Sequence, residues 1–253
     1  MEIAQIGNNR MPGELANSAE HSDNFEDQRA APSRKVQAIE VAVFLLLIVP
    51  SMALSFLSGK QADLRFSVMA ISSILNDLAL LSLVLYFVWR NHESVESIGW
   101  NFEHLGRDVT LGLILFAPVF MGGNALANVL HQIGLSAPER QPSFLVVSGF
   151  KQVILGLLIV TIVAVVEETV FRGYLMLRFQ AVTSSPSAAV ILSSLMFFLG
   201  HGYEGMAGAI SVFGLGVVFA LIYLWRRSLV APIVIHFLTD FTSIVLPALL
   251  QRS

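Results

Sequence analysis

Apolar residues fall in blocks of about twenty along most of this chain, the length that one helix needs to cross a bilayer. The blocks follow one another with short gaps from residue 36 to residue 250. The 253 residues are 55% hydrophobic and only 13% charged, and the mean hydropathy is +0.71. The sequence therefore predicts an all-α fold, a polytopic membrane protein with about seven transmembrane helices in one bundle.

We place each span by the ends of its apolar block. The predicted spans are 36–57, 64–89, 109–133, 144–179, 188–201, 206–225 and 229–250. The fourth block is longer than one bilayer crossing requires at about 1.5 Å of rise per residue. We therefore expect it to tilt, to project into the cytosol, or to break at Gly149 or Gly156.

The N-terminal segment differs from the rest in composition. Residues 1–33 are polar and rich in acids, with almost no apolar periodicity, which is typical of disordered segments. We therefore divide the chain into a disordered polar tail, 1–33, and a membrane domain, 34–253. Lysine and arginine are more frequent beside the span ends that lie on the side of the tail, which predicts a cytosolic N-terminus.

Charge and cysteine content exclude several functions. The net charge is −3 and the basic residues are scattered at the ends of the apolar blocks, so no nucleic-acid partner is expected. The chain has no cysteine, which excludes disulfides, thiolate catalysis and cysteine metal sites. We expect no cofactor, and the partners we expect are the lipid bilayer and a peptide or protein substrate. The sequence leaves the oligomeric state open.

Three charged residues follow the long apolar run of the fourth block: Glu167, Glu168 and Arg172. Charge in a membrane helix costs several kcal/mol unless it is paired or lines a wet cavity, and so indicates a functional site. Glu168 and Arg172 are four residues apart, the spacing of a pair on one helix face. Glu167 points about 100° away from Glu168. We therefore predict a Glu168–Arg172 ion pair, with Glu167 facing a different partner.

Two histidines and an aspartate complete a candidate site. His201 ends the fifth span, and His236 and Asp240 lie four residues apart in the seventh. Helical rise allows all of them to share one depth with Glu167. A carboxylate and an imidazole can activate water, a second imidazole can stabilise an oxyanion, and Asp240 can orient His236. Each group alone is commonly structural, as a helix cap or as a contact between helices. Their joint occurrence favours catalysis.

Asp77, beside Asn76, interrupts the second apolar block. A carboxylate at this depth needs a partner. We interpret Asp77 as a packed polar residue hydrogen-bonded to a neighbouring helix rather than as part of the chemistry.

Three motifs in this chain resemble those of the CPBP family of intramembrane proteases, which includes the CAAX prenyl endopeptidases and the bacterial Abi proteins. Residues 167–172 match EExxxR, residues 197–201 match FxxxH, and residues 236–240 match HxxxN/D. The resemblance covers about 110–250. The tail and the first two spans resemble nothing specific.

The resemblance implies a metal-independent, glutamate-type intramembrane endopeptidase, a CAAX-prenyl-protease-like hydrolase that cleaves a membrane-associated or lipidated peptide. It also implies a multi-pass protein of a bacterial cytoplasmic membrane. By carry-over, the general base is Glu167 with His201 beside it, the oxyanion side holds His236 and Asp240, and the supporting pair is Glu168 with Arg172.

Three other functions remain compatible with the sequence. The chain could be a non-proteolytic scaffold or bacteriocin-immunity protein of the same family. Glu167, His201 and His236 could instead bind zinc in a metal-dependent membrane peptidase. A proton-coupled transporter is the third alternative, because buried carboxylates and imidazoles also form proton relays.

Overall fold

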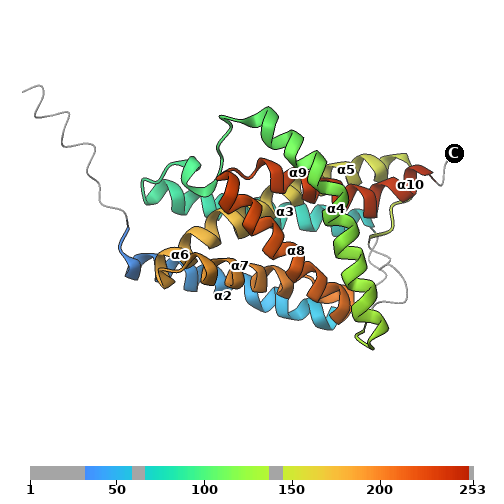
Figure 1. Cartoon of the computed structure of the whole chain (residues 1–253), viewed down its shortest axis with the longest axis horizontal. Helices are drawn as coiled ribbons and strands as arrows, with labels where there is room; N and C mark the ends of the chain where they lie inside the picture. The colour runs from blue at the N-terminus through green and yellow to red at the C-terminus, as the bar shows by residue number, and fades with distance from the viewer. Residues whose placement is uncertain (1–31, 59–65, 137–144, 251–253) are drawn as a thin grey trace, which may run out of the picture. The chain divides into compact units, whose positions relative to one another are not determined.

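The computed structural model describes residues 32–58, 66–136 and 145–250, and within these ranges the fold is helical without a strand. Ser33–Ser253 forms one compact unit (Figure 1). The all-α prediction is confirmed. The predicted tail, 1–33, lies outside the described residues except for its last two positions.

In the part of the chain that the structure describes, the predicted spans correspond to seven helical rods. The α-helices are α2 (Arg34–Ser58), α3 (Phe66–Arg90), α4 (Leu105–Gln132), α5 (Phe150–Glu168), α6 (Met176–Thr183), α7 (Pro186–Gly200), α8 (Gly205–Arg226), α9 (Val230–Asp240) and α10 (Leu246–Leu250). The shorter elements are the 3-10 turns η1 (Val95–Ile98) and η4 (Gly202–Glu204) and the π-helical segments η3 (Thr169–Leu175) and η5 (Phe241–Val245). η3 joins α5 to α6 in one rod, and η5 joins α9 to α10 in another.

Five of the described rods are long and apolar enough to cross a membrane. They contain α3, α4, α5 with α6, α8, and α9 with α10, whereas α7 is a shorter apolar helix of 15 residues. Large apolar side chains such as Leu46, Ile114 and Leu221 are exposed on the outer faces, as expected of helices that contact lipid. The chain is an integral, multi-pass membrane protein.

The fourth span is one unbroken rod of 34 residues, Phe150–Thr183. Gly149 precedes its first residue with φ of 81°, so this glycine starts the rod instead of dividing it. Gly156 lies inside α5, where a Cβ would come within 3.3 Å of Val245 Cγ2. The expected break is therefore absent at Gly156, whereas Gly149 marks the start of the rod. The rod changes geometry further along, at η3.

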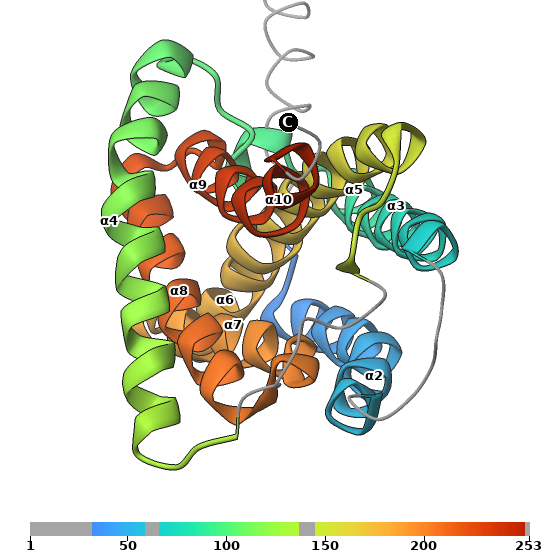
Figure 2. The ribbon, with the colours of Figure 1, turned by 90° about the vertical axis from the view of Figure 1, so that its right-hand side faces the viewer.

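The α5–η3–α6 rod is the central element of the bundle. α5 packs against α3 and α9, and α6 packs against α2 and α7. α4 lies along both α8 and α9 on another side (Figure 2). Every residue of η3 is buried as a result. The segment that begins directly after Glu168 is thus enclosed by other helices.

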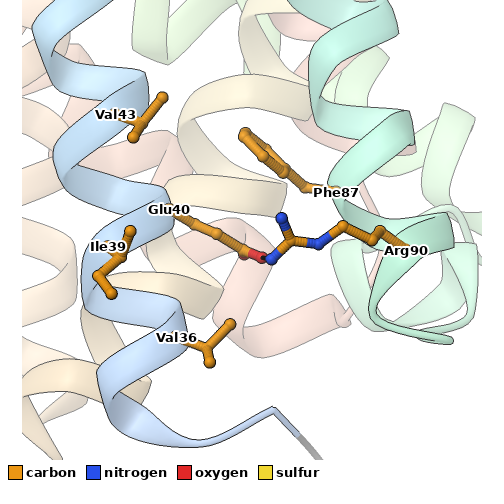
Figure 3. A pocket seen from close by; sticks show the side chains of 6 residues that line it. All are labelled: Val36, Ile39, Glu40, Val43, Phe87 and Arg90. Carbon is orange, nitrogen blue, oxygen red and sulfur yellow. Dashed lines mark hydrogen bonds and ion pairs between the residues drawn. The ribbon is translucent and has the colours of Figure 1, made fainter.

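A buried ion cluster ties α2, α3 and α6 together at one end of the bundle. Arg178 of α6 donates to Glu93 through Nη1 at 2.7 Å, and its Nε lies 3.3 Å from Glu40 Oε2. Arg90 of α3 donates to Glu40 Oε1 at 2.8 Å. Figure 3 shows Glu40 and Arg90 pointing toward each other across a pocket. The pocket is lined by Val36, Ile39, Glu40, Val43, Phe87 and Arg90.

Gly173→Ala is expected to destabilise the fold. A Cβ at Gly173 would overlap the backbone carbonyl oxygen of Ile98, which cannot swing aside as a flexible side chain could. We expect the free energy of unfolding to fall by about 1–3 kcal/mol. Unfolding in detergent, followed by tryptophan fluorescence, measures it. Gly122→Ala is the matched control because no heavy atom lies within 4 Å of its added Cβ, and equal stability of the two variants would contradict the prediction.

Candidate active site

His236 of α9 lies among three carboxylates in the membrane region of the bundle. Its Nδ1 is 2.8 Å from Glu168 Oε1. Its Nε2 is 3.7 Å from Glu167 Oε2 and 3.5 Å from Asp240 Oδ2. The structure therefore brings four of the predicted site residues together, from α5 and α9, which pack against each other.

Glu168 forms the predicted ion pair with Arg172. Arg172 Nη1 donates to Glu168 Oε1 at 3.0 Å, and both side chains are fully buried. The guanidinium carbon lies 4.1 Å from the ring centre of Phe197 and 5.3 Å from that of Phe219. A Cβ at Gly216 would come within 3.3 Å of Arg172 Nη2, so this glycine leaves room for the guanidinium. The buried cation is stabilised by one carboxylate and by aromatic faces.

Glu167 and Glu168 contact the same residue, His236, on opposite sides of its ring. Glu167 lies on the Nε2 side of His236, whereas Glu168 binds Nδ1. The side chains of Glu167 and Asp240 are each 24% exposed, whereas that of Glu168 is fully buried. Among the described residues, Glu167 Oε2 has no hydrogen-bond partner. This oxygen is itself buried and lies 3.7 Å from His236 Nε2; without a hydrogen bond it retains the capacity to accept a proton.

Asp240 lies on the opposite side of the imidazole from the group that holds the ring most closely. The shorter contact, 2.8 Å, joins Glu168 to Nδ1, and Asp240 approaches Nε2 at 3.5 Å. Since a carboxylate only accepts, Nδ1–H donates to Glu168. The orienting role that we assigned to Asp240 therefore fits Glu168 better.

His201 sits just beyond the end of α7, and its ring packs on Phe197 at a centroid distance of 4.6 Å. Nδ1 is 2.9 Å from the carbonyl oxygen of Phe197, so Nδ1 carries the proton and Nε2 is the acceptor of the neutral ring. Within the described ranges, the imidazole in contact with Glu167 is that of His236, not His201. The Phe197 ring also packs against His236, at 6.0 Å, so one phenyl ring contacts both imidazoles.

The two helices that carry the carboxylates change geometry directly after them. α5 ends at Glu168 and α9 ends at Asp240, and a π-helical segment follows in each case. Short π-helical segments inside α-helices occur frequently at functional sites. The sequence does not predict either segment, since no proline or glycine pair marks them.

Two further carboxylates, which we had not assigned to the site, interact with it. Asp77 of α3 interacts electrostatically with Glu167 on the neighbouring α5. Glu204 of η4 interacts electrostatically with His201 and Asp240. A comparison of depths along the predicted spans could have indicated Asp77, but the position of Glu204 depends on the turn after α7.

The metal-binding alternative receives no support from the side-chain arrangement. In the part of the chain that the structure describes, no group of three His, Asp or Glu residues is placed to hold a metal ion. Glu167, His201 and His236 therefore do not form a zinc site in this conformation.

Comparison with known proteins agrees with the motifs. Residues 149–242 match the family described as "Type II CAAX prenyl endopeptidase Rce1-like". The match covers less than half of the chain but includes all three motifs. No curated protein and no solved structure matches the chain.

The Glu168–Arg172 pair is expected to show strong energetic coupling. Arg172→Met leaves a buried carboxylate without its cation and should lower the free energy of unfolding by about 3–5 kcal/mol. In the double variant with Glu168→Gln, the total loss should be smaller than the sum of the single losses. The free energy of unfolding of all three variants is measured in detergent. The control combines Arg172→Met with Glu103→Gln on the exposed connector, where the losses should add; additivity at Glu168 as well would contradict the pairing.

Proposed function

Residues 149–242 belong to the Rce1-like family of type II CAAX prenyl endopeptidases, and from this premise we propose that the chain is a metal-independent intramembrane endopeptidase. The family is one of CAAX proteases, which are hydrolases. The proposed substrate is a membrane-associated or lipidated peptide or protein. The observation that carries the proposal is the cluster in which Glu167 and Asp240, both partly exposed, face the same nitrogen of His236.

Glu167 is the proposed general base. It takes a proton from water while the water oxygen forms a bond to the carbonyl carbon of the peptide. The π electrons of the C=O bond move to the carbonyl oxygen. The partial exposure of the Glu167 side chain and the lack of a hydrogen bond at its Oε2 support this role. When the C–N bond breaks, Glu167 returns the proton to the leaving amine, so the carboxylate is regenerated. His201 accepts a hydrogen bond from the same water through Nε2, since Nδ1–H is bound to Phe197.

His236 is the proposed oxyanion donor. Glu168 accepts the Nδ1 proton, which directs Nε2 toward the side where Glu167 and Asp240 lie. When the ring carries both protons, Nε2–H can donate to the developing oxyanion. Asp240, 3.5 Å from Nε2, favours that charged ring. Arg172 does not touch the substrate in this scheme; it neutralises Glu168.

The basic end of the bundle supports a cytosolic N-terminus, which we propose as the orientation. α2 begins at the end of the bundle where α3 and α6 finish. Arg34, the first residue of α2, donates to the carbonyl oxygens of Ala181 and Val182 near the end of α6. Arg90 and Arg178 lie at the same end, in the ion cluster. Basic residues beside span ends favour the cytosolic side.

Glu167→Gln is expected to abolish peptide cleavage without unfolding the protein. Removal of the base should lower kcat by about 10²–10⁴-fold, because general acid–base catalysis typically contributes that much. The assay follows cleavage of apolar and lipidated peptides by the full chain in nanodiscs, with and without a strong chelator. Glu103→Gln removes a carboxylate from the exposed connector and should retain full activity.

Three results would contradict parts of this proposal. Cleavage that persists in Glu167→Gln would exclude Glu167 as the base. Loss of cleavage in the presence of chelator would favour the zinc peptidase. Absence of cleavage by the wild type, with cellular activity retained by Glu167→Gln, would favour the scaffold function.

A further inference from the structure

Phe219 of α8 contacts two functional groups of the candidate active site at once. Its ring centre lies 5.3 Å from the guanidinium carbon of Arg172 and 5.8 Å from the ring centre of His236, and the two rings are tilted by 37°. Both separations are within the ranges of cation–π and aromatic contacts. Phe219 lies outside the three motifs, in the interval between 197–201 and 236–240. α8 therefore reaches the site through a residue that no motif indicates.

The face of α8 that carries Phe219 packs closely against the site. α8 contacts α7, η3 and α9. Gly216 lies three residues before Phe219, on the same helix face. An added Cβ at Gly216 would come within 3.2 Å of Ser194 Cβ on α7 and 3.3 Å of Arg172 Nη2. Because glycine has no side chain, this face approaches the guanidinium, and the phenyl ring follows about one turn later.

Phe219 is enclosed by apolar side chains and does not face a bound peptide. Its exposed fraction is 2%, and it packs in one cluster with Ile222 of its own helix and with Ala231 and Ile235 of α9. Ile235 directly precedes His236. Any effect of the ring on catalysis therefore passes through the two functional groups that it contacts.

The guanidinium of Arg172 has few contacts that fix its orientation. Nη1 donates to Glu168 Oε1 at 3.0 Å, whereas Nε and Nη2 have no hydrogen-bond partner among the described residues. Other contacts are with phenyl rings, among them Phe197 at 4.1 Å and Phe219 at 5.3 Å. A ring attracts a cation to its face, and its volume excludes other positions of the guanidinium. The rings therefore keep Nη1 directed at the carboxylate that binds His236.

We propose that Phe219 is a positioning residue of the endopeptidase. It holds Arg172 against Glu168, which in turn accepts the Nδ1 proton of His236. Through its direct contact it also keeps Nε2 of the imidazole on the side of the two partly exposed carboxylates. The inference rests on the endopeptidase function proposed above. Since a displacement of about 1 Å can cost about 10²-fold in rate, the ring affects the chemical step rather than peptide binding.

Phe219→Met tests the aromatic ring, because methionine is apolar and flexible enough to fill a buried space without one. The assay measures cleavage of an apolar peptide by the full chain in nanodiscs, per folded molecule. We expect kcat to fall about 10–100-fold and KM to change by less than about twofold, because the side chain does not contact the peptide. Phe219→Leu is measured in parallel, so that the result does not depend on how one replacement packs.

Phe179→Met is the matched control. Phe179 of α6 is also a buried phenylalanine, 6% exposed, and it packs in the core cluster that contains Phe44 and Tyr174. Its replacement removes a ring from the core at a distance from the two histidines. We expect kcat and KM to be retained in this variant.

The Nδ1 proton of His236 gives a readout that does not depend on cleavage. It is observed by NMR of the full chain with ¹⁵N-labelled histidine and assigned by comparison with His236→Gln. The wild type should exchange this proton slowly with water, because Glu168 accepts it inside the bundle. In Phe219→Met we expect exchange at least about threefold faster, since the imidazole opens more often, and in Phe179→Met no change.

The outcomes distinguish this inference from the function on which it rests. A retained kcat in Phe219→Met, or an exchange rate equal to that of the wild type, would overturn the positioning role, while cleavage by the wild type still upheld the endopeptidase. A rise in KM with unchanged kcat would overturn it as well. If the wild type cleaves no peptide, the endopeptidase function fails and the exchange rate decides: faster exchange in Phe219→Met would support positioning of the imidazole, and equal exchange would exclude it.

Discussion

The rest of the site depends on the two contacts that the Glu168 carboxylate makes. One oxygen, Oε1, accepts from Arg172 at 3.0 Å and from His236 Nδ1 at 2.8 Å. These two contacts join the central rod to α9 without any exposed charge between them. Because Glu168 fixes Nδ1, the other nitrogen of His236 must face Glu167 and Asp240. A buried charge thus determines which atoms remain accessible for chemistry, and the protein tolerates its desolvation because both contacts are short.

The surroundings of Arg172 explain why the helices pack as closely as they do. A guanidinium that cannot reach water needs partners on its faces as well as its edges, and Phe197 and Phe219 cover those faces. Phe197 also contacts His201 and His236, so the ring that covers the cation positions both imidazoles. The FxxxH spacing follows from this arrangement: the phenyl ring lies one turn before His201, whose Nδ1 binds the Phe197 carbonyl.

The sequence predicts those parts of the structure that depend on one helix at a time. The seven rods follow from the apolar blocks, and the Glu168–Arg172 pair follows from a spacing of four residues. The sequence does not predict contacts that depend on the rotation of one helix against another. The contact of His236 with Glu167 and the interaction of Asp77 with Glu167 therefore could not be predicted. The π-helical segments also escaped prediction, because their hydrogen bonds depend on the packing around the rod and not on residue type.

The two π-helical segments have a consequence for how this chain can change length. A π turn holds more residues than an α turn, so each segment carries surplus backbone within an otherwise regular rod. Loss of one residue within Thr169–Leu175 or Phe241–Val245 can be absorbed by a return to α geometry. Loss of one residue elsewhere in these rods would rotate everything beyond it by about 100°. Single-residue deletions compatible with this architecture should therefore collect in these two segments, immediately after the carboxylates whose directions must not change.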